Sequence, residues 1–466
     1  MRPNSWVDEL AGLVRTETLF RDGVDLLSFT RDASVVSPGI PQVAVRPSTP
    51  EEIGAVLAFA QSRDVPVYAR GAGSMYAGGA IPSAGGIVLD LTALDRVIEI
   101  DEARGIVIVE AAVTFGTLLK VLNARGLTIG VVPMTGASGT IGGAVSSHGL
   151  GTGSPKFQSL GDEVAGLEVV LADGSIVRTG SAASRGAGFF QRYCIGADLT
   201  GLFIGANSAF GAITKIALWL HRAPAHFETL CVGFPDAVGG TRFLIELQGR
   251  EMTRNVWYGA VYDSPAIKGK MASLRPDVVQ ASLPALCVGL DLRGDRDEVA
   301  RDRATIIAMA QAQGGDTFDI YDEIFFRKLR RDYTFWYAFA GYCTLSRSAL
   351  LMTSLPTDTV PAFFEKVADI RARHAQFVWG GGIVLCRRGV HGALIGFYDE
   401  AKQWQEMQNV LTGVRRELLD LGAVPYKSGQ LWADTASSYP EYQNLLGRLK
   451  GAIDPARIMG RGNLGT

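Results

Sequence analysis

Three glycine-rich segments in the first half of the chain constrain its fold more than any other feature of the sequence. They read YARGAGSMYAGGA (68–80), TGASGTIGGAVSSHG (135–149) and DLTGLFIGANSAFGAIT (198–214), and each is tied to an apolar stretch typical of a strand. Glycine has no Cβ, so its backbone can approach a ligand closely, and successive N–H groups in such loops form nests that bind anions. One such segment is often only a turn, but three in one half of a chain predict a site for a flat or phosphorylated ligand.

The spacing in the first segment argues against the commonest nucleotide sites. After Gly71 and Gly73, position 76 is Tyr and not the third glycine of the G-x-G-x-x-G motif, and the chain has no Walker A motif. NAD and ATP are therefore disfavoured as ligands.

Composition narrows the class of protein further. The chain has 466 residues, of which 47% are hydrophobic and 20% charged, so it can form two or three domains with packed cores. A formal net charge of -2 without a long Lys/Arg run gives no electrostatic case for nucleic acid or a membrane surface. The sequence has no 18-residue apolar run and no signal segment at its start, and its five cysteines are dispersed. These features predict a cytoplasmic protein with reduced thiols.

The order of predicted elements indicates an α+β chain in three parts. Strands at 65–70, 106–113, 164–171 and 213–221 adjoin the glycine-rich segments. Thr49 and Pro50 are typical of a helix start, as N-cap and first helical residue. After Pro224, strand-like and helix-like runs alternate up to about Ala423, which indicates a separate domain with an antiparallel sheet. We expect one domain over 1–224, a second over 225–424, and a closing segment over 425–466.

The order of the motifs RGAGS…GGA, GTIGGAVSS…GDEVAGLEVVLADG and DLTGLFIGANSAFGAITK resembles the vanillyl-alcohol oxidase/4-cresol dehydrogenase superfamily of PCMH-type FAD-binding flavoproteins. That superfamily also contains D-lactate and glycolate oxidising enzymes. The last residues, LKGAIDPARIMGRGNLG, are similar to its closing segment. The resemblance implies an FAD-binding domain of two α+β subdomains, completed by the closing segment, and an α+β cap domain with a large antiparallel sheet.

The resemblance also implies which residues contact FAD. In the superfamily the first segment holds the pyrophosphate, and the second lies along the isoalloxazine ring and ribityl chain. Ser74 replaces the flavin-linking His of many members, and Arg461 replaces a usual Lys. The implied cofactor contacts are Arg70, Gly71, Ala72, Gly73, Ser74, Met75, Gly78, Gly79, Pro133, Gly136, Ser138, Gly139, Thr140, Gly142, Gly143, Ser146, Gly149, Gly205, Gly211, Ile213, Arg461 and Asn463.

The segment GAVPYKSGQLWAD (422–434) is similar to the part of phenol-oxidising members in which a Tyr–Arg pair binds the substrate's phenolate. This implies that Tyr426 and Lys427, with Tyr76 as a third donor, hold the substrate. Thr152 falls where a residue near flavin N5 is found. Lys keeps the charge of Arg but loses its bidentate geometry, which leaves room for a carboxylate. The alternative is that Tyr426 is a packed aromatic residue and Lys427 a surface residue.

His391, at the start of a predicted strand in RRGVHGALIGFYDE, has three interpretations. The resemblance places it where phenol oxidisers carry a cap-domain His covalently attached to the flavin. It is otherwise a substrate or metal contact, or a structural residue; no second His lies nearby in the sequence, and we expect no metal site. His148 faces the flavin or packs its loop. The aromatic run from Asp332 to Tyr342 either lines a substrate pocket or is part of the core.

Three functions compete. The first is oxidation of a para-substituted phenol or aromatic alcohol by hydride transfer to FAD. The second is dehydrogenation of a D-2-hydroxy acid, with Lys427 or a cap arginine holding the carboxylate. The third is a flavin-carrying subunit without its own turnover. The expected partners are a small-molecule substrate, oxygen or an electron-carrier protein as acceptor, and a second copy of the chain in a homodimer. The cap arginines are Arg327, Arg330, Arg331, Arg387 and Arg388.

Overall fold

The computed structural model describes residues 5–265, 283–318 and 347–465. Within them, the first sheet has the order β1 (Leu19–Phe20), β2 (Val43–Val45), β4 (Ile87–Asp90), β3 (Val67–Arg70), with β2 and β3 parallel to β4. Helix α3 (Pro50–Ser62) begins as predicted, because the Thr49 hydroxyl accepts the N–H of Glu52. Its apolar side packs into the core of this sheet. Two short helices, α1 (Ser5–Ala11) and α2 (Gly23–Leu27), precede it.

The second sheet is antiparallel and has β12 (Ala212–Arg222) at its centre. Its path is β11 (Ile176–Arg178), β10 (Val164–Val170), β12, β6 (Ile106–Glu110), β5 (Val97–Asp101), and β7 (Leu127–Ile129) pairs with the end of β12. Helix α4 (Phe115–Asn123) buries Leu118 and Leu122 in the same core. Around it lie a two-stranded sheet, β8 (Val132–Pro133) and β9 (Gly151–Thr152), and the short helices α5 (Ile141–Val145), α6 (Ser154–Phe157) and α7 (Thr200–Phe203).

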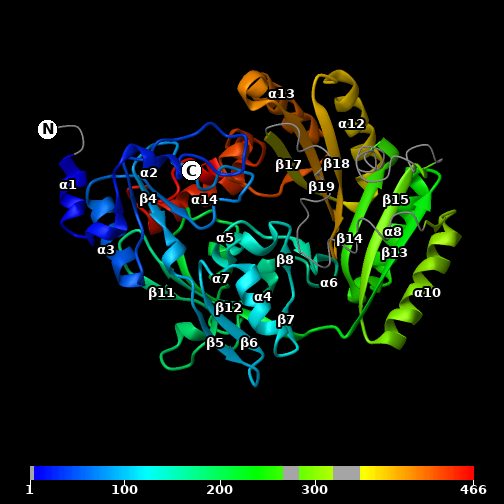
Figure 1. The fold of residues 1–466 in the computed structure, drawn as a ribbon, viewed down its shortest axis with the longest axis horizontal. Coiled ribbons are helices and arrows are strands. Elements are labelled where there is room, and N and C mark those ends of the chain that lie inside the picture. Colours follow the sequence, from blue (N-terminus) through cyan, green and yellow to red (C-terminus); the bar gives the residue numbers. More distant parts are fainter. Residues whose placement is uncertain (1–4, 266–282, 319–346, 466) are drawn as a thin grey trace.

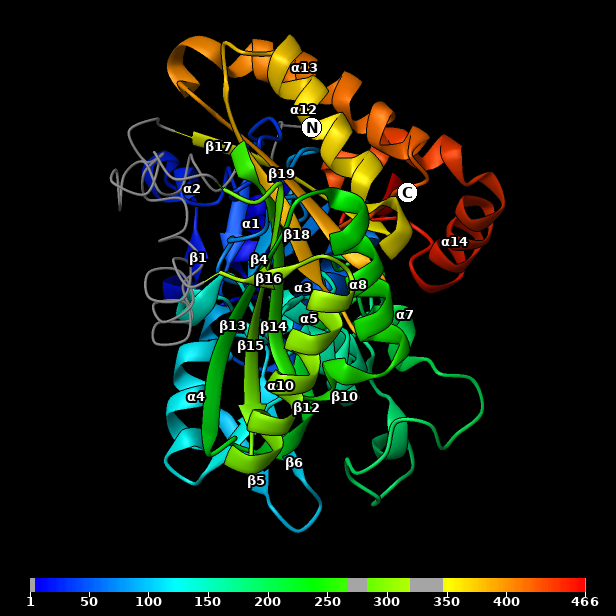
Figure 2. The same cartoon turned by 90° about the vertical axis from the view of Figure 1, so that its right-hand side faces the viewer.

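The third sheet lies in the middle of the chain. Its eight described strands, all paired antiparallel, run in the order β16 (Asp316–Thr317), β13 (His226–Phe234), β15 (Leu286–Gly294), β14 (Val256–Asp263), β18 (Val378–Leu385), β19 (Val390–Tyr398), β17 (Arg347–Leu355), β20 (Val424–Pro425). Helices α8 (Ala237–Gly249), α10 (Arg296–Ala312), α12 (Val360–Arg373) and α13 (Glu400–Asp420) cover one face, as Figures 1 and 2 show. The other face turns toward the first two sheets.

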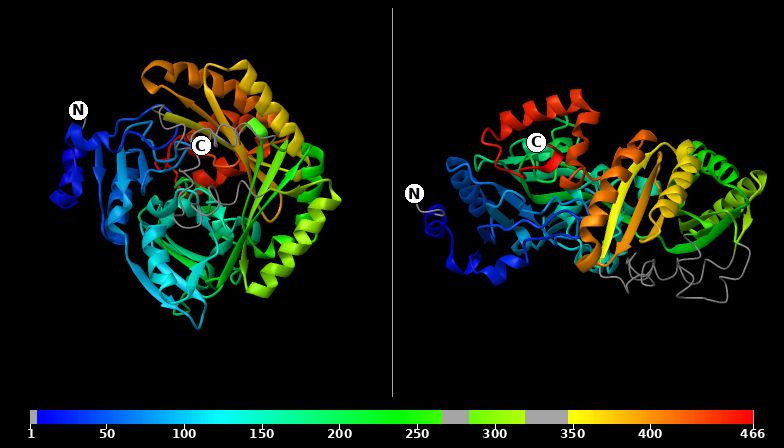
Figure 3. Two further views of the ribbon diagram at one scale, coloured as in Figure 1. Left: turned by 45° about the vertical axis from the view of Figure 1, so that its right-hand side comes forward. Right: turned by 90° about the horizontal axis from the view of Figure 1, so that it is seen from above.

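The closing segment returns to the first sheet. After β20 the chain forms α14 (Pro440–Ile453), which lies beside the N-terminal sheets in Figure 3. Val67 of β3 donates its N–H to the carbonyl of Ile458 and accepts the N–H of Gly460, both at 2.8 Å. The residues that end the described chain therefore extend the sheet from which the first glycine-rich segment departs.

No helix in the described ranges is long and apolar enough to cross a membrane.

Candidate functional site

A first cavity lies where the glycine-rich segments meet. Strand β3 ends at Arg70 and delivers the first segment, α5 belongs to the second, and β12 begins one residue after Gly211 in the third. The implied cofactor contacts that line this cavity are Arg70, Gly71, Ala72, Gly73, Ser74, Met75, Gly79, Pro133, Gly139, Thr140, Gly142, Gly143, Ser146 and Ile213. Segments far apart in sequence therefore form one surface.

Two glycines show why the cavity requires this residue type. Gly73 has φ +64°, and a Cβ there would lie 2.2 Å from the guanidinium of Arg70. A Cβ at Gly71 would lie 2.4 Å from the hydroxyl of Thr140, so one of the two residues would have to move. With no side chain at either glycine, the loop backbone itself lines the cavity, and we call this surface the cradle. A cofactor with a pyrophosphate and a flat ring system, as in FAD, fits this arrangement.

The charge of the cavity also suits an anionic cofactor. Of the described residues that line it, Arg70 and Lys427 carry positive charge. Burial lowers the pKa of the Arg70 guanidinium, and the carboxylates of Asp32 and Asp90 oppose this shift. Arg70 also donates a hydrogen bond to the carbonyl of Arg31 at 2.7 Å, which fixes the side chain beside the first segment.

Two polar residues of the third segment that line this cavity were not predicted. They are Asn207 and Ser208, with φ values of +48° and +62°. The signal was present in the sequence, because Asn adopts left-handed backbone conformations more readily than most residues and lies here between Gly205 and Gly211. Our sequence interpretation named only the glycines and Ile213.

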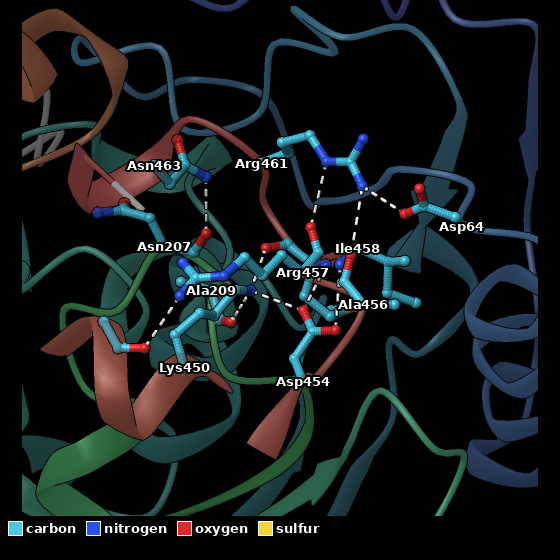
Figure 4. Close-up of polar contacts among 12 residues, drawn as sticks. Asp64, Asn207, Ala209, Lys450, Asp454, Ala456, Arg457, Ile458, Arg461 and Asn463 are labelled. Atoms are coloured by element: carbon cyan, nitrogen blue, oxygen red, sulfur yellow. Dashed lines mark hydrogen bonds and ion pairs between the residues drawn. The ribbon is translucent and has the colours of Figure 1, made fainter. Parts of the chain in front are cut away.

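Several implied contacts lie outside the cavity. Arg461, expected near the flavin or its phosphates, instead forms an ion pair with Asp64 at 2.8 Å and hydrogen-bonds the carbonyl of Arg457 (Figure 4). Gly205 packs against the ring of His148, where a Cβ would lie 2.0 Å from Cδ2. The others that do not line it are Gly78, Gly136, Ser138, Gly149, Gly211, His391 and Asn463.

Asn463 does not line the cavity, but it hydrogen-bonds two of the loops that do. Its Nδ2 donates to the carbonyls of Gly79 at 3.0 Å and Asn207 at 2.8 Å, and thereby joins the first and third glycine-rich segments. The side chain is fully buried. Asn463 is therefore a clamp on the loops, and Figure 4 shows its amide beside Asn207.

A buried ion pair holds the closing segment in place. Lys450 contacts Asp454 at 2.7 Å, and the two side chains are 1% and 0% exposed. Lys450 also donates to the carbonyls of Met459 and Ala209, while Asp454 accepts the N–H groups of Ile458 and Met459 (Figure 4). All charges and donors of the pair are thus partnered, and the network ties α14 to the third glycine-rich segment.

A second cavity, about 100 Å³ in volume, adjoins the first and shares Pro133, Thr135 and Lys427 with it. Its other wall is the free face of the third sheet. Gly382 leaves room there, because a Cβ at this position would lie 2.4 Å from the ring of Tyr262. The apolar side chains of this wall are Leu350, Met352, Ile383, Val384, Ala393, Ile395 and Phe397.

The three residues implied to bind the substrate meet in the second cavity. Tyr76, Tyr426 and Lys427 all line it, although 350 positions separate Tyr76 from Tyr426. Burial raises the pKa of both tyrosines, and the Tyr76 hydroxyl interacts with Ser348. The Tyr426 hydroxyl donates to the carbonyl of His148, so it is held by the protein. Burial lowers the pKa of Lys427 to about 8.

A third cavity, about 830 Å³ in volume, lies on the other side of Tyr426, which lines both. His391 and His148 line the third cavity and neither of the first two. His391 hydrogen-bonds Ser354 at 3.1 Å, and its ring lies 4.7 Å from that of Tyr426. Thr152 pairs with Val132 in the small sheet and lines none of the three cavities, so the structure does not place it beside the substrate residues.

The remaining predicted cap residues lie elsewhere. Arg388 lines the third cavity, and Arg387 lines a fourth with it, so neither reaches the second cavity. Arg327, Arg330, Arg331 and the aromatic run 332–342 fall outside the described residues. Among the described side chains, no group of three or more His, Cys, Asp or Glu residues could hold a metal ion.

Known proteins are similar to the N-terminal part of this chain and to the chain as a whole. Residues 41–180 match the family described as FAD binding domain. An FAD-linked oxidoreductase of Mycobacterium tuberculosis is 26% identical over 91% of each chain, and a D-lactate dehydrogenase of Archaeoglobus fulgidus is 30% identical over 52% of each. The solved structure of p-cresol methylhydroxylase covers 99% of this chain and 96% of its own, with a TM-score of 0.86 and 18% identity.

The class is thus defined by the fold and by one domain: the chain has the fold of p-cresol methylhydroxylase, which confirms the predicted fold class, and its residues 41–180 match the family described as FAD binding domain. More particularly, it is an FAD-dependent oxidoreductase with FAD as its cofactor. The interpretation as a flavin carrier without turnover is thereby set aside.

Proposed function

We propose that the enzyme oxidises a para-substituted phenol or a related aromatic alcohol. The observation that carries this proposal is the second cavity, which is mostly apolar, adjoins the cradle for FAD and is lined by Tyr76, Tyr426 and Lys427. An aromatic ring suits apolar walls, and its hydroxyl suits these three polar side chains. p-Cresol methylhydroxylase, whose solved structure has its substrate bound, has the same fold.

The residues of the cavity have separable roles. FAD, when bound, accepts the hydride that the substrate loses. The ammonium of Lys427 and the hydroxyl of Tyr76 stabilise negative charge on the substrate's oxygen, because preorganised donors in a site without water favour a developing anion. Leu350 and Ile395 exclude water from the ring. Tyr426 orients the pocket, since its own hydroxyl is bonded to the backbone at His148.

A D-2-hydroxy acid is the second candidate substrate. The similarity to a D-lactate dehydrogenase over 52% of the chain favours it, and Lys427 supplies a charge for a carboxylate. Against it, the described walls of the second cavity carry no second cation that would share the carboxylate, and most of their side chains are apolar. A small, strongly hydrated acid would gain little from such walls.

Anaerobic titration of the flavin absorbance distinguishes the two substrates. We expect para-alkylphenols to bleach the flavin, and D-lactate and other D-2-hydroxy acids to leave it oxidised. Tyr76→Phe should slow bleaching by a para-alkylphenol by ~10² to 10³, since one lost hydrogen bond to the transition-state charge costs about 2–4 kcal/mol. Tyr439→Phe, which removes a hydroxyl from the third cavity, is the matched control. Bleaching by hydroxy acids alone would contradict the proposal.

A further inference from the structure

The fourth cavity, about 620 Å³ in volume, lies where the FAD-binding part of the chain meets the cap. Helix α6 lines it from the FAD-binding part, and the 3-10 helix Met252–Asn255 and the turn between β18 and β19 line it from the cap. Helix α6 also packs against β14, beside which Figure 1 shows it. None of the residues that line this cavity lines the first or the second, so the proposed function gives it no role.

Positive charge is concentrated in the walls of the fourth cavity. Four cationic side chains line it, and they come from three separate segments: Lys156 from α6, Arg254 from the 3-10 helix, and Arg387 and Arg388 from the turn. Among the described residues that line it, Glu251 is the one carboxylate. The whole chain has a formal net charge of -2, so this concentration does not follow from a basic composition.

Most of these cations lack an ion pair of their own. Arg254 pairs with Asp302 at 3.3 Å. In the part of the chain that the structure describes, Lys156, Arg387 and Arg388 have no carboxylate within ion-pair distance. Three like charges around one space repel each other, and an anion between them would turn that repulsion into attraction.

Lys156 is the cation that the FAD-binding part contributes. Its amine lies 5.3 Å from the ring centroid of Phe157 and 5.7 Å from that of Trp257, and these rings hold the side chain beside the cavity. Burial lowers the pKa of the amine, and the carboxylates of Glu298 and Glu163 oppose this shift from a distance. A bound anion would offset the cost of burying this charge.

Hydrogen bonds from both parts of the chain fix the turn that carries the two arginines. The N–H of Arg387 donates to the carbonyl of Ser154, and the N–H of Arg388 donates to Oε1 of Gln158, both at 3.1 Å. Gln248 of α8 donates to two carbonyls of the same turn, at 3.0 and 2.8 Å. The backbone from which the guanidinium groups extend is thus ordered before any ligand binds, which lowers the entropic cost of binding.

We propose that the fourth cavity binds a diphosphate group, which bridges the FAD-binding part and the cap. Arginine binds phosphate through two parallel N–H···O bonds, and lysine adds a point charge. A diphosphate carries about three negative charges at neutral pH, which matches the three cations without an ion pair. The group has two possible sources, inorganic pyrophosphate or an organic diphosphate, and the cavity is large enough for either. This site is independent of the substrate that the enzyme oxidises.

Calorimetric titration of the FAD-loaded enzyme tests the site. FAD fills the first cavity in this form, so the added ligand cannot bind there. We expect inorganic pyrophosphate or ADP to bind at one site per chain and to raise the Tm of the enzyme. AMP, which lacks one phosphoryl group, should bind about tenfold or more weakly at the same ionic strength, the loss expected for one charge-assisted hydrogen bond. Tighter binding of ADP supports an organic diphosphate, and tighter binding of pyrophosphate supports the inorganic one.

Two variants locate the site on the two parts of the chain. Lys156→Gln and Arg387→Gln should each raise the Kd for pyrophosphate about tenfold or more. Arg416→Gln is the matched control, because it removes an exposed cation of α13 that does not line the cavity, and it should leave the Kd unchanged. FAD content and Tm without pyrophosphate report whether each variant folds; Arg388→Gln replaces either variant that fails to fold.

The outcomes that would overturn the proposal are distinct. Absence of binding by both pyrophosphate and ADP would refute the site, and equal affinity for AMP and ADP would refute its assignment to a diphosphate. An unchanged Kd in Arg387→Gln would place the binding elsewhere on the protein. Weakened binding in Arg387→Gln with an unchanged Kd in Lys156→Gln would refute the bridge to the FAD-binding part.

Discussion

His391 shows how a single position decides between chemical roles. The sequence resemblance implied that His391 is covalently attached to the flavin. In the structure its imidazole hydrogen-bonds Ser354, stacks edge-on against Tyr426 and lines the third cavity. His391 shares this cavity with Tyr426 and Lys427, but it lines neither the second cavity nor the FAD cradle. The geometry therefore favours the structural interpretation, and the link through His391 stays a prediction.

Acid precipitation tests this residue. We expect trichloroacetic acid to leave no more flavin on the precipitated native protein than on the His391→Ala variant, because the imidazole is held away from the FAD cradle. The measurement is flavin fluorescence of the protein band on a denaturing gel. A fluorescent native band that disappears in His391→Ala would establish the covalent link and contradict our expectation.

At this scale the sequence was informative where backbone geometry is involved. Gly71, Gly73 and Thr140, which the resemblance named as cofactor contacts in two separate segments, line the first cavity together, and glycine at a close approach leaves a recognisable pattern in the sequence. Side-chain direction was not predictable in the same way. Nothing local to Arg461 says that it turns to Asp64, and nothing local to Tyr426 says that its hydroxyl bonds the carbonyl of His148. Both depend on contacts between residues hundreds of positions apart.

At the scale of elements, α14 and the turn after it give the closing sequence a physical meaning. The residues of LKGAIDPARIMG that carry it are Lys450 and Asp454, one helical turn apart, which pair with each other inside the protein. A buried ion pair adds little net stability over apolar residues, but removal of one partner leaves a charge without compensation. Such a pair specifies how the segment docks.

A double-mutant cycle measures this coupling. Lys450→Met should lower the free energy of unfolding by about 3–5 kcal/mol, because it leaves the carboxylate of Asp454, which is 0% exposed, without its ion-pair partner. Lys450→Met combined with Asp454→Asn should cost less than the sum of the two single changes. Urea unfolding, followed by tryptophan fluorescence, gives the values. The exposed pair of Arg373 and Asp369 is the control, and its removal should cost far less. Additive single costs would contradict the coupling.

At the scale of the whole molecule, the FAD cradle is built from both ends of the sequence. Asn463 joins the first and third glycine-rich segments, and residues 458–460 pair with β3. A chain ending at Pro425 should therefore lose FAD during gel filtration while it keeps helical and strand signals in circular dichroism. The ratio of flavin to protein absorbance measures the loss. A truncated chain that kept one FAD per molecule would refute the dependence on the closing segment.

The start of the third sheet could be predicted from the sequence, because the composition of the chain changes there. The change in composition after Pro224 coincides with the start of β13 at His226, the first strand of the third sheet. The order of strands within that sheet was not predictable, because β14 pairs with β18 more than 100 positions later, and such long-range pairing leaves no local pattern.

Because Asn463 lies near the end of the chain, it also determines when during synthesis the FAD-binding loops can be held together. Roughly 250 residues separate the third glycine-rich segment from this clamp. A ribosome that adds about 5–20 residues per second needs about 12 to 50 s to make them. Throughout that time the loops that will hold FAD have been synthesised but have no clamp. Loading of the flavin is therefore completed after translation of the cap, and a cell short of FAD would accumulate finished chains, not stalled ones.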